Sequence, residues 1–258
     1  MKLSHREFGG TGDCPILLLH GLLGSARNWV TVGKLLSDGA PVFALDLRNH
    51  GNSPHADVMD YSLMADDVLH WMDAHSITTA HLVGHSMGGK TAMRLACSHA
   101  ERVRSLTIAD IAPRSYAPHF RTAFDAMHQI EPQHYRRIAE VEAALAPHLN
   151  DAAMRQFLVT NLKRNDSGTF DWQINLSAIT RALSTLSESP LNTGDQYDGP
   201  SLLLHGEHSD FVLPEDHQII RNHFPNLTSA VVPDSGHNVH VENRTFFADQ
   251  VLHLIRNS

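Results

Sequence analysis

The sequence predicts an α/β fold with a mostly parallel, doubly wound sheet. Continuous apolar runs, which are typical of strands covered on both faces, alternate with amphipathic helical patterns. One apolar run leads through a Gly-x-Ser-x-Gly pattern straight into a helix-like segment. The alternation stops between residues 114 and 190, where helical patterns prevail and no clear strand is visible, and then resumes.

The first half of the chain gives most of the predicted sheet. We expect a short strand over residues 3–8 and a strand buried on both faces over residues 15–20. A helical pattern follows over residues 26–36, and the next buried strand covers residues 41–46. Residues 62–75 have apolar side chains at helical spacing, which predicts an amphipathic helix.

Strands and helices continue to alternate through the rest of the chain. The strand that carries the Gly-x-Ser-x-Gly pattern begins at Ala80, and its helix is expected over residues 90–97. Further strands are predicted at 104–110, 200–206 and 229–232, with helices at 215–223 and 245–256. A core of residues 1–113 and 191–258 is therefore expected, with residues 114–190 as a helical insertion above the carboxyl ends of the strands, where such sheets place their sites.

Composition narrows the possible partners. The 258 residues suit one large domain with an insertion, and a net charge of -8 argues against binding nucleic acid or an anionic membrane surface. Two cysteines form no disulfide framework, the first residues contain no apolar signal segment, and no apolar run is long enough to span a bilayer. The twenty histidines are scattered without metal-ligand spacing, so we expect neither a metal nor a cofactor.

Ser86 is the predicted nucleophile. It lies in the middle of the Gly-x-Ser-x-Gly pattern, at the apex of a sharp turn between strand and helix. A serine hydroxyl needs a base, and His237 is the best candidate because it follows the last predicted strand and is preceded by glycine. His85 is adjacent to the serine, but on such a turn its side chain points the other way, so we interpret it as structural.

The histidine in turn needs a carboxylate, and two aspartates follow strands. Asp110 directly ends the strand after the Gly-x-Ser-x-Gly helix. Asp210 lies in the location that is commoner in this kind of fold, but the usual register there is Gly-x-x-Asp, and Ser209 occupies that position. We favour Asp110 on register, with Asp210 as the alternative.

The developing oxyanion needs backbone N–H donors. One donor is expected to be the amide of Met87, which follows the nucleophile. The other is expected from the loop after the first buried strand, with Leu22 favoured and Leu23 as the alternative. The loop that contains Arg48, Asn49 and His50 is interpreted as structural support for this oxyanion loop, with a solvated loop as the alternative.

Four motifs in this order resemble the α/β-hydrolase superfamily: residues 20–24 (His-Gly-Leu-Leu-Gly), 46–53 (Asp-Leu-Arg-Asn-His-Gly-Asn-Ser), 84–88 (Gly-His-Ser-Met-Gly) and 236–237 (Gly-His). Within it, the second motif and the Asp-Ile-Ala-Pro at 110–113 resemble the YbfF-type esterases. The resemblance implies a helical cap inserted after the sixth strand, an acid at the Asp110 position, and a cytoplasmic carboxylesterase without a cofactor.

The predicted function is therefore hydrolysis of a small-molecule ester. The resemblance implies short-chain acyl esters and extends to acyl-CoA thioesters, with an acyl-enzyme on Ser86. Aromatic and methionine side chains of residues 114–190 are expected to form an apolar acyl pocket. A carbon–carbon bond hydrolase or a lactonase on the same fold is the alternative enzyme. A ligand-binding, receptor-like module with weak turnover is the alternative from another class.

Overall fold

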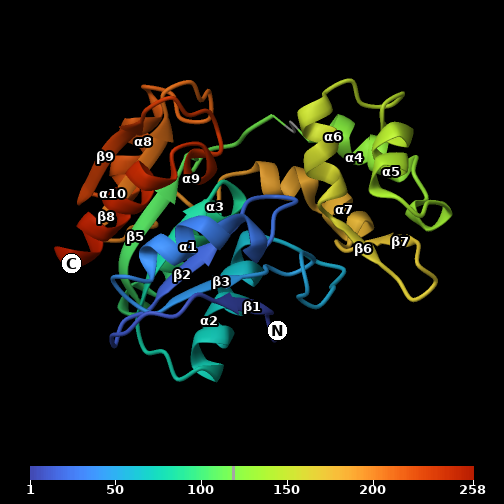
Figure 1. Cartoon of the computed structure of the whole chain (residues 1–258). Coiled ribbons are helices and arrows are strands. Elements are labelled where there is room, and N and C mark those ends of the chain that lie inside the picture. The colour runs from blue at the N-terminus through green and yellow to red at the C-terminus, as the bar shows by residue number, and fades with distance from the viewer. Residues whose placement is uncertain (118–119) are drawn as a thin grey trace.

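The computed structural model describes residues 1–117 and 120–258. In these ranges seven strands form one sheet in the order β1-β3-β2-β4-β5-β8-β9 (Figure 1). The strands are β1 (His5–Glu7), β2 (Ile16–Leu19), β3 (Val42–Leu45), β4 (Ala80–His85), β5 (Val103–Ala109), β8 (Ser201–Gly206) and β9 (Leu227–Val232). β1 pairs antiparallel with β3 at one edge, and the other pairs are parallel. The predicted fold class is confirmed.

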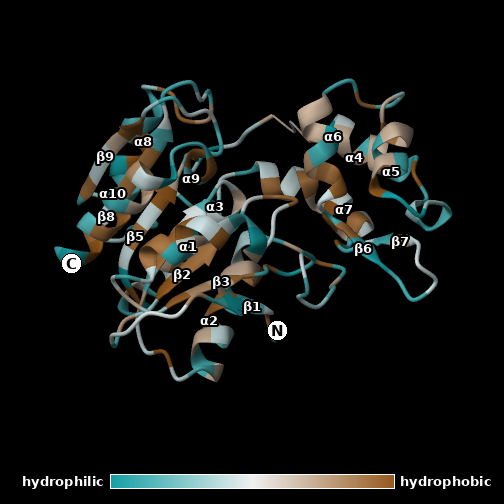
Figure 2. Ribbon diagram, in the orientation of Figure 1, coloured by the Kyte–Doolittle hydropathy of each residue, from teal (hydrophilic) through white to brown (hydrophobic). Residues whose placement is uncertain are grey.

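The unbroken apolar runs belong to strands that are covered on both faces of the sheet, as the sequence predicts. All residues of β2 and β4 are buried, because helices cover both faces of the sheet. Helices α1 (Val30–Leu36) and α10 (Arg244–Arg256) pack together on one face. The opposite face is covered by α2 (Tyr61–Ala74), α3 (Met87–Ser98) and α8 (Asp216–His223). Figure 2 shows the hydrophobic strands between these two layers.

Shorter helices connect these elements. Three 3-10 helices cover Ala26–Trp29, Ala100–Arg102 and Pro132–His134, and a one-turn helix, α9 (Val239–Glu242), precedes α10. The first of them and α1 divide the single helix that was expected over residues 26–36. No helix of the described ranges has the length and apolar character needed to cross a membrane.

The segment after β5 is mainly helical. It contains α4 (Arg121–His128), α5 (Ile138–Leu145), α6 (Ala152–Val159) and α7 (Leu176–Ser187), which lie beside the sheet in Figure 1. We refer to residues 121–187 as the α4–α7 segment. Residues 118–119, which fall in the expected cap, lie outside the described residues.

Two expectations about this segment need correction. It contains a two-stranded antiparallel hairpin, β6 (Leu162–Arg164) and β7 (Phe170–Trp172), where no clear strand was expected. The turn residues between these strands separate two runs too short to stand out by periodicity. The segment also follows the fifth strand and not the sixth, because residues 1–113 contain five strand-forming segments.

Candidate active site

The Gly-x-Ser-x-Gly pattern forms the predicted elbow. Ser86 connects β4 to α3 with φ 52° and ψ -118°, a conformation that L-residues rarely adopt and that places the side chain at the apex of the turn. A Cβ on Gly84 would lie 2.3 Å from the Gly88 carbonyl oxygen, and a Cβ on Gly88 would lie 2.2 Å from that of Leu19. The two glycines therefore allow the helix to cross this close to the sheet.

Asp110 and His237 are brought together from distant parts of the chain. His237 Nδ1 lies 2.8 Å from Asp110 Oδ2. The carboxylate follows β5 in a left-handed conformation, φ 52°, and is fully buried. The Gly206 amide donates to Asp110 Oδ1 at 2.9 Å, and the Ser209 hydroxyl donates to Oδ2. A buried carboxylate with three donors fixes the histidine tautomer, so that Nε2 is left for other partners.

Asp210 is not part of this group. Its side chain is exposed, and no contact joins it to His237 within the described residues. Ser209, which occupies the register position where the fold usually has an aspartate, instead donates its hydroxyl to Asp110. The displaced register thus places a hydroxyl, not a carboxylate, at the end of β8.

His237 is held from two further sides. The ring of Phe211 stacks on it with centroids 3.6 Å apart and planes at 18°. His85 Nε2 lies 2.8 Å from the His237 carbonyl oxygen, so the interpretation of His85 as structural agrees with its position. Burial and the neighbouring histidines, His240 first, lower the pKa of His85 well below its usual value, and a neutral ring therefore donates this hydrogen bond.

Ser86 and His237 line the same cavity, which has a volume of about 400 Å³. No hydrogen bond joins the two side chains in the part of the chain that the structure describes. Hydrogen bonds between nucleophile and base are often long in ligand-free sites and tighten when substrate binds. The structure thus places the side chains of Ser86 and His237 in one cavity, without the direct hydrogen bond that the reaction needs.

The predicted oxyanion donors can be distinguished by their partners. The Leu23 amide donates to His50 Nε2 at 3.2 Å and is therefore occupied. Among the described residues, the amides of Leu22 and Met87 donate to no protein acceptor. Met87 is the first residue of α3, so its N–H is one of the free donors at the positive end of a helix. This arrangement favours Leu22 over Leu23.

Two buried histidines connect the loop over residues 20–24, where the oxyanion donors are predicted, to the following loop. His50 Nδ1 donates to the Arg48 carbonyl oxygen and Nε2 accepts from Leu23, while His20 Nε2 accepts from the Leu47 amide at 3.0 Å. Burial lowers the pKa of His20 to about 4 and that of His50 to about 3. Both rings are neutral at pH 7 and can each donate and accept one hydrogen bond.

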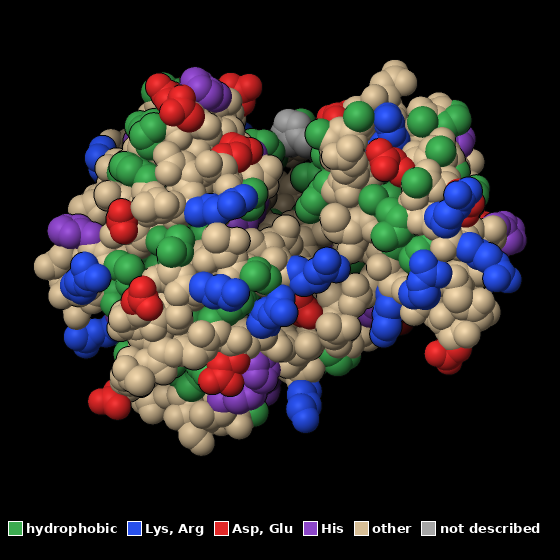
Figure 3. Space-filling view, in the orientation of Figure 1, with side chains coloured by type: hydrophobic (Ala, Val, Ile, Leu, Met, Phe, Trp, Pro, Cys, Tyr) green, Lys and Arg blue, Asp and Glu red, His purple; other side chains and the backbone are tan. Residues whose placement is uncertain are grey.

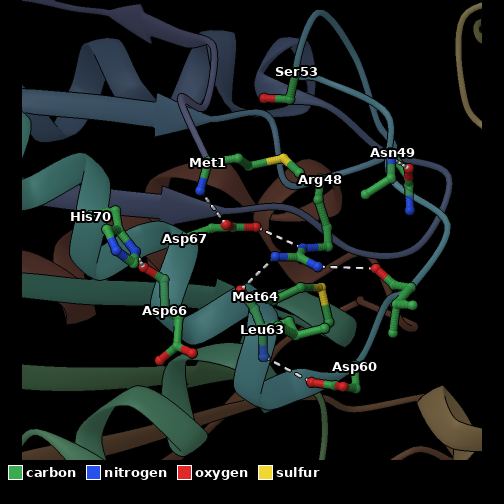
Figure 4. A network of polar contacts seen from close by, with 12 residues as sticks. Met1, Arg48, Asn49, Ser53, Asp60, Leu63, Met64, Asp66, Asp67 and His70 are labelled. Carbon is green, nitrogen blue, oxygen red and sulfur yellow. Dashed lines mark hydrogen bonds and ion pairs between the residues drawn. The ribbon is translucent and has the colours of Figure 1, made fainter.

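The second loop is itself fixed by a buried ion pair (Figure 4). Arg48 Nε donates to Asp67 Oδ2 of α2 at 2.6 Å, and its other nitrogens donate to the carbonyl oxygens of Val58 and Leu63. The amine of Met1 binds the other oxygen of Asp67 at 2.6 Å. Arg48 thus ties the loop over residues 48–50 to α2, and His50 of the same loop contacts the Leu23 amide.

Two cavities meet at Ser86. The larger lies between the core and the α4–α7 segment, in the region where Figure 3 shows the surface hollowed between the two parts of the molecule. The smaller cavity, of about 70 Å³, is lined by Ser86 together with residues of α3 and α7. Ser86, Leu22, Phe120 and Phe211 line both of them. The smaller cavity is otherwise lined by Tyr61, Met87, Lys90, Ile111, Tyr116, Ala117, Leu183, Leu186 and Ser187.

Sequence reasoning missed two residues at this site. Phe211 carries no pattern that could mark it, because its role depends on where the loop after β8 folds back. Lys90 did have a signal: it is the one charged residue near the start of an otherwise small and apolar helical run, four residues after Ser86. The start of this helix is buried, so the side chain at position 90 faces the interior, where lysine is rare.

A serine on a strand–turn–helix elbow, with a histidine and a buried carboxylate supplied after later strands of one parallel sheet, defines the class of α/β hydrolases. The chain matches the family model for the alpha/beta hydrolase fold over residues 15–244. It therefore belongs to the α/β-hydrolase family, and it is a hydrolase. The expected family resemblance is confirmed.

Individual relatives extend over almost the whole chain. The chain is 35% identical to the sn-1-specific diacylglycerol lipase ABHD11 of Xenopus tropicalis, across 100% of this chain and 83% of that protein. It is 31% identical to esterase YbfF of Escherichia coli, across 95% of this chain and 92% of that protein. A solved marine microorganism esterase matches with a TM-score of 0.93 and 32% identity, covering 98% of this chain and 99% of that one.

Proposed function

We propose that this hydrolase cleaves carboxylic esters of short acyl chains through an acyl-enzyme on Ser86. The observation that carries the proposal is the 2.8 Å contact between His237 Nδ1 and the buried Asp110 carboxylate, on the edge of the sheet where Ser86 lies. The names of the relatives, a diacylglycerol lipase and two esterases, support ester substrates.

In the proposed reaction, Ser86 Oγ attacks the ester carbonyl while His237 Nε2 takes its proton. The negative charge on the carbonyl oxygen is stabilised by the amides of Leu22 and Met87. His237 then protonates the leaving alcohol, and Asp110 stabilises the imidazolium. In the second half of the reaction water attacks the acyl-enzyme, with His237 again as the base. A thioester would react by the same steps.

The two cavities suggest where the acyl chain and the leaving group of a substrate bind. The smaller one has a largely apolar lining, which suits a short acyl chain. The larger one opens between the core and the α4–α7 segment and suits the alcohol or thiol group. We propose that residues 114–190 act as the cap that provides side chains such as Phe120, Met154 and Phe157 to these walls.

The test is hydrolysis of p-nitrophenyl acetate and butyrate by the purified protein. Steady release of p-nitrophenol is expected from the wild type, and Ser86→Ala is expected to reduce kcat to the background rate because no acyl-enzyme can form. Acyl-CoA thioesters of the same chain lengths, assayed in parallel, compare the two leaving groups. Turnover that survives in Ser86→Ala would disprove the proposed nucleophile.

A further inference from the structure

Lys90 is buried one helical turn after the proposed nucleophile. It lies in the first turns of α3, and only 2% of the residue is exposed. Its Nζ donates to the carbonyl oxygen of Glu188 at 2.5 Å and to that of Ser187 at 3.3 Å. An ammonium group has three N–H donors, so one remains after these two contacts.

The Lys90 ammonium has no carboxylate partner. In the described ranges no ion pair joins it to an acidic group, and the nearby Glu188 side chain is exposed. Arg114, the other cation close by, pairs with Asp216 at 2.8 Å. A buried charge is costly unless it is paired, and burial lowers the pKa of Lys90 to about 7. The position therefore favours an anionic partner from outside the chain.

The ammonium lies at the wall of the smaller cavity. Its neighbours line that cavity: Nζ is 5.5 Å from the centroid of the Tyr61 ring and 4.9 Å from that of Tyr116, and it binds Ser187. The two tyrosine hydroxyls donate to the carbonyl oxygens of Leu186 and Phe211. Their protons are therefore already used, and the ammonium is left as the donor for an anion at this wall.

Ser86 and Lys90 thus face one small space. A cavity of about 70 Å³ holds roughly five water-sized groups, which matches a chain of three or four carbons with a terminal polar group. A neutral acyl chain of that length would leave the ammonium without an anionic partner. A chain that ends in a carboxylate would supply one.

We propose that Lys90 binds a carboxylate at the far end of the acyl chain, so that the enzyme prefers half-esters of short dicarboxylic acids over neutral esters of equal length. The proposal rests on the proposed acyl-enzyme at Ser86. It assigns Lys90 to substrate selection, beyond its contacts with residues 187 and 188. A purely structural Lys90 would maintain the fold without changing the preference between acyl groups.

The experiment compares kcat/KM for monomethyl glutarate and methyl pentanoate at pH 6.5, with the released acid measured by chromatography. Alkyl esters are used because activated half-esters cleave spontaneously. The wild type is expected to favour the half-ester by about 10- to 100-fold, the range of a charge-assisted hydrogen bond. Lys90→Met is expected to remove this preference through KM while methyl pentanoate is still hydrolysed. Lys90→Arg keeps a cation and should retain part of the preference.

Matched controls distinguish an effect of Lys90 in the cavity from an effect of the net charge of the protein. Lys34→Met removes an exposed lysine of α1 and should leave the preference unchanged. Free glutarate is expected to bind the wild type in calorimetry and to bind Lys90→Met at least 10-fold more weakly. Three results would each overturn the proposal. These are a wild-type preference for methyl pentanoate, an equal preference in the wild type and Lys90→Met, and no binding of glutarate to the wild type. Failure to cleave either ester while glutarate still binds would instead contradict the proposed function.

Discussion

At the residue scale, the site depends on one carboxylate in an unusual place. Asp110 adopts a left-handed conformation directly after β5 and receives hydrogen bonds from Gly206, Ser209 and His237. These donors come from two later parts of the chain, the end of β8 and the loop after β9. Together these hydrogen bonds fix the carboxylate oxygen that faces His237.

Asp110→Asn should therefore lower kcat for p-nitrophenyl butyrate by about 10³- to 10⁴-fold, because an amide can hold the wrong histidine tautomer in place. The matched variant Asp210→Asn changes an exposed side chain and should remain within about twofold of the wild type. Steady-state kinetics of the two purified variants decide between the aspartates. Loss of activity in Asp210→Asn alone would contradict the choice of Asp110.

Much of this residue-scale arrangement could be predicted from the sequence. The carboxyl ends of neighbouring parallel strands meet at one edge, so the positions of Ser86, Asp110 and His237 after their strands predicted their proximity. Phe211 and Lys90 could not be assigned in the same way. The place of each depends on how loops and the α4–α7 segment fold against the core, and local patterns carry no information on such long-range packing.

At the scale of elements, the oxyanion loop is held by a chain of contacts that ends in α2. His50 binds the Leu23 amide, and Arg48, two residues earlier, binds Asp67 within the core. The side chains of Arg48 and Asp67 are only 8% and 3% exposed. Because removing one member of a buried pair leaves a charge without compensation, this contact matters for both the loop and the fold.

Asp67→Asn should destabilise the protein by about 3–5 kcal/mol, since Arg48 would keep its charge without a carboxylate. The same change at the exposed neighbour, Asp66→Asn, should alter stability by less than about 0.5 kcal/mol. Urea denaturation followed by circular dichroism measures both. Equal stability of the two variants would show that the carbonyl oxygens of Val58 and Leu63 compensate Arg48 without the Asp67 charge.

At the scale of the whole molecule, the two hydrophobic layers and the α4–α7 segment enclose a charged lysine. Helices on the α2–α3 face join the segment in one apolar cluster, while α1 and α10 form the other on the opposite face of the sheet. The positions of the sheet strands along the chain follow from the apolar runs, and the sequence predicted them well, but not their order in the sheet. The cavities lie where this cluster meets residues far apart in sequence, and periodicity alone could not predict their shape.

The burial of Lys90 predicts a dependence of stability on pH. Its pKa is about 7 in the folded protein against 10.5 for an unperturbed lysine, so between these values the unfolded chain binds more protons and stability rises with pH. Arg114 nearby lowers the pKa of Lys90 and Glu188 raises it. Burial raises the pKa of Tyr116 to about 12 and that of Tyr61 even further, so both stay neutral in this range.

The free energy of unfolding of the wild type should therefore increase relative to Lys90→Met between pH 7 and pH 9.5. The expected slope is at most about 1.4 kcal/mol per pH unit. Denaturant titrations of both proteins at four pH values provide the measurement, and their difference removes the titration of all other groups. Parallel profiles would mean that Lys90 keeps its proton throughout this range.

The hydrogen bond between Ser209 and Asp110 has a consequence for how such sites diverge. Two adjacent strand ends converge on a single oxygen, one supplying the negative charge and the other a neutral hydroxyl. Either end can carry the charge while the imidazole stays where it is. The acid of such a site is thus defined by its position beside the histidine, and a carboxylate after either of the two neighbouring strands would occupy that position.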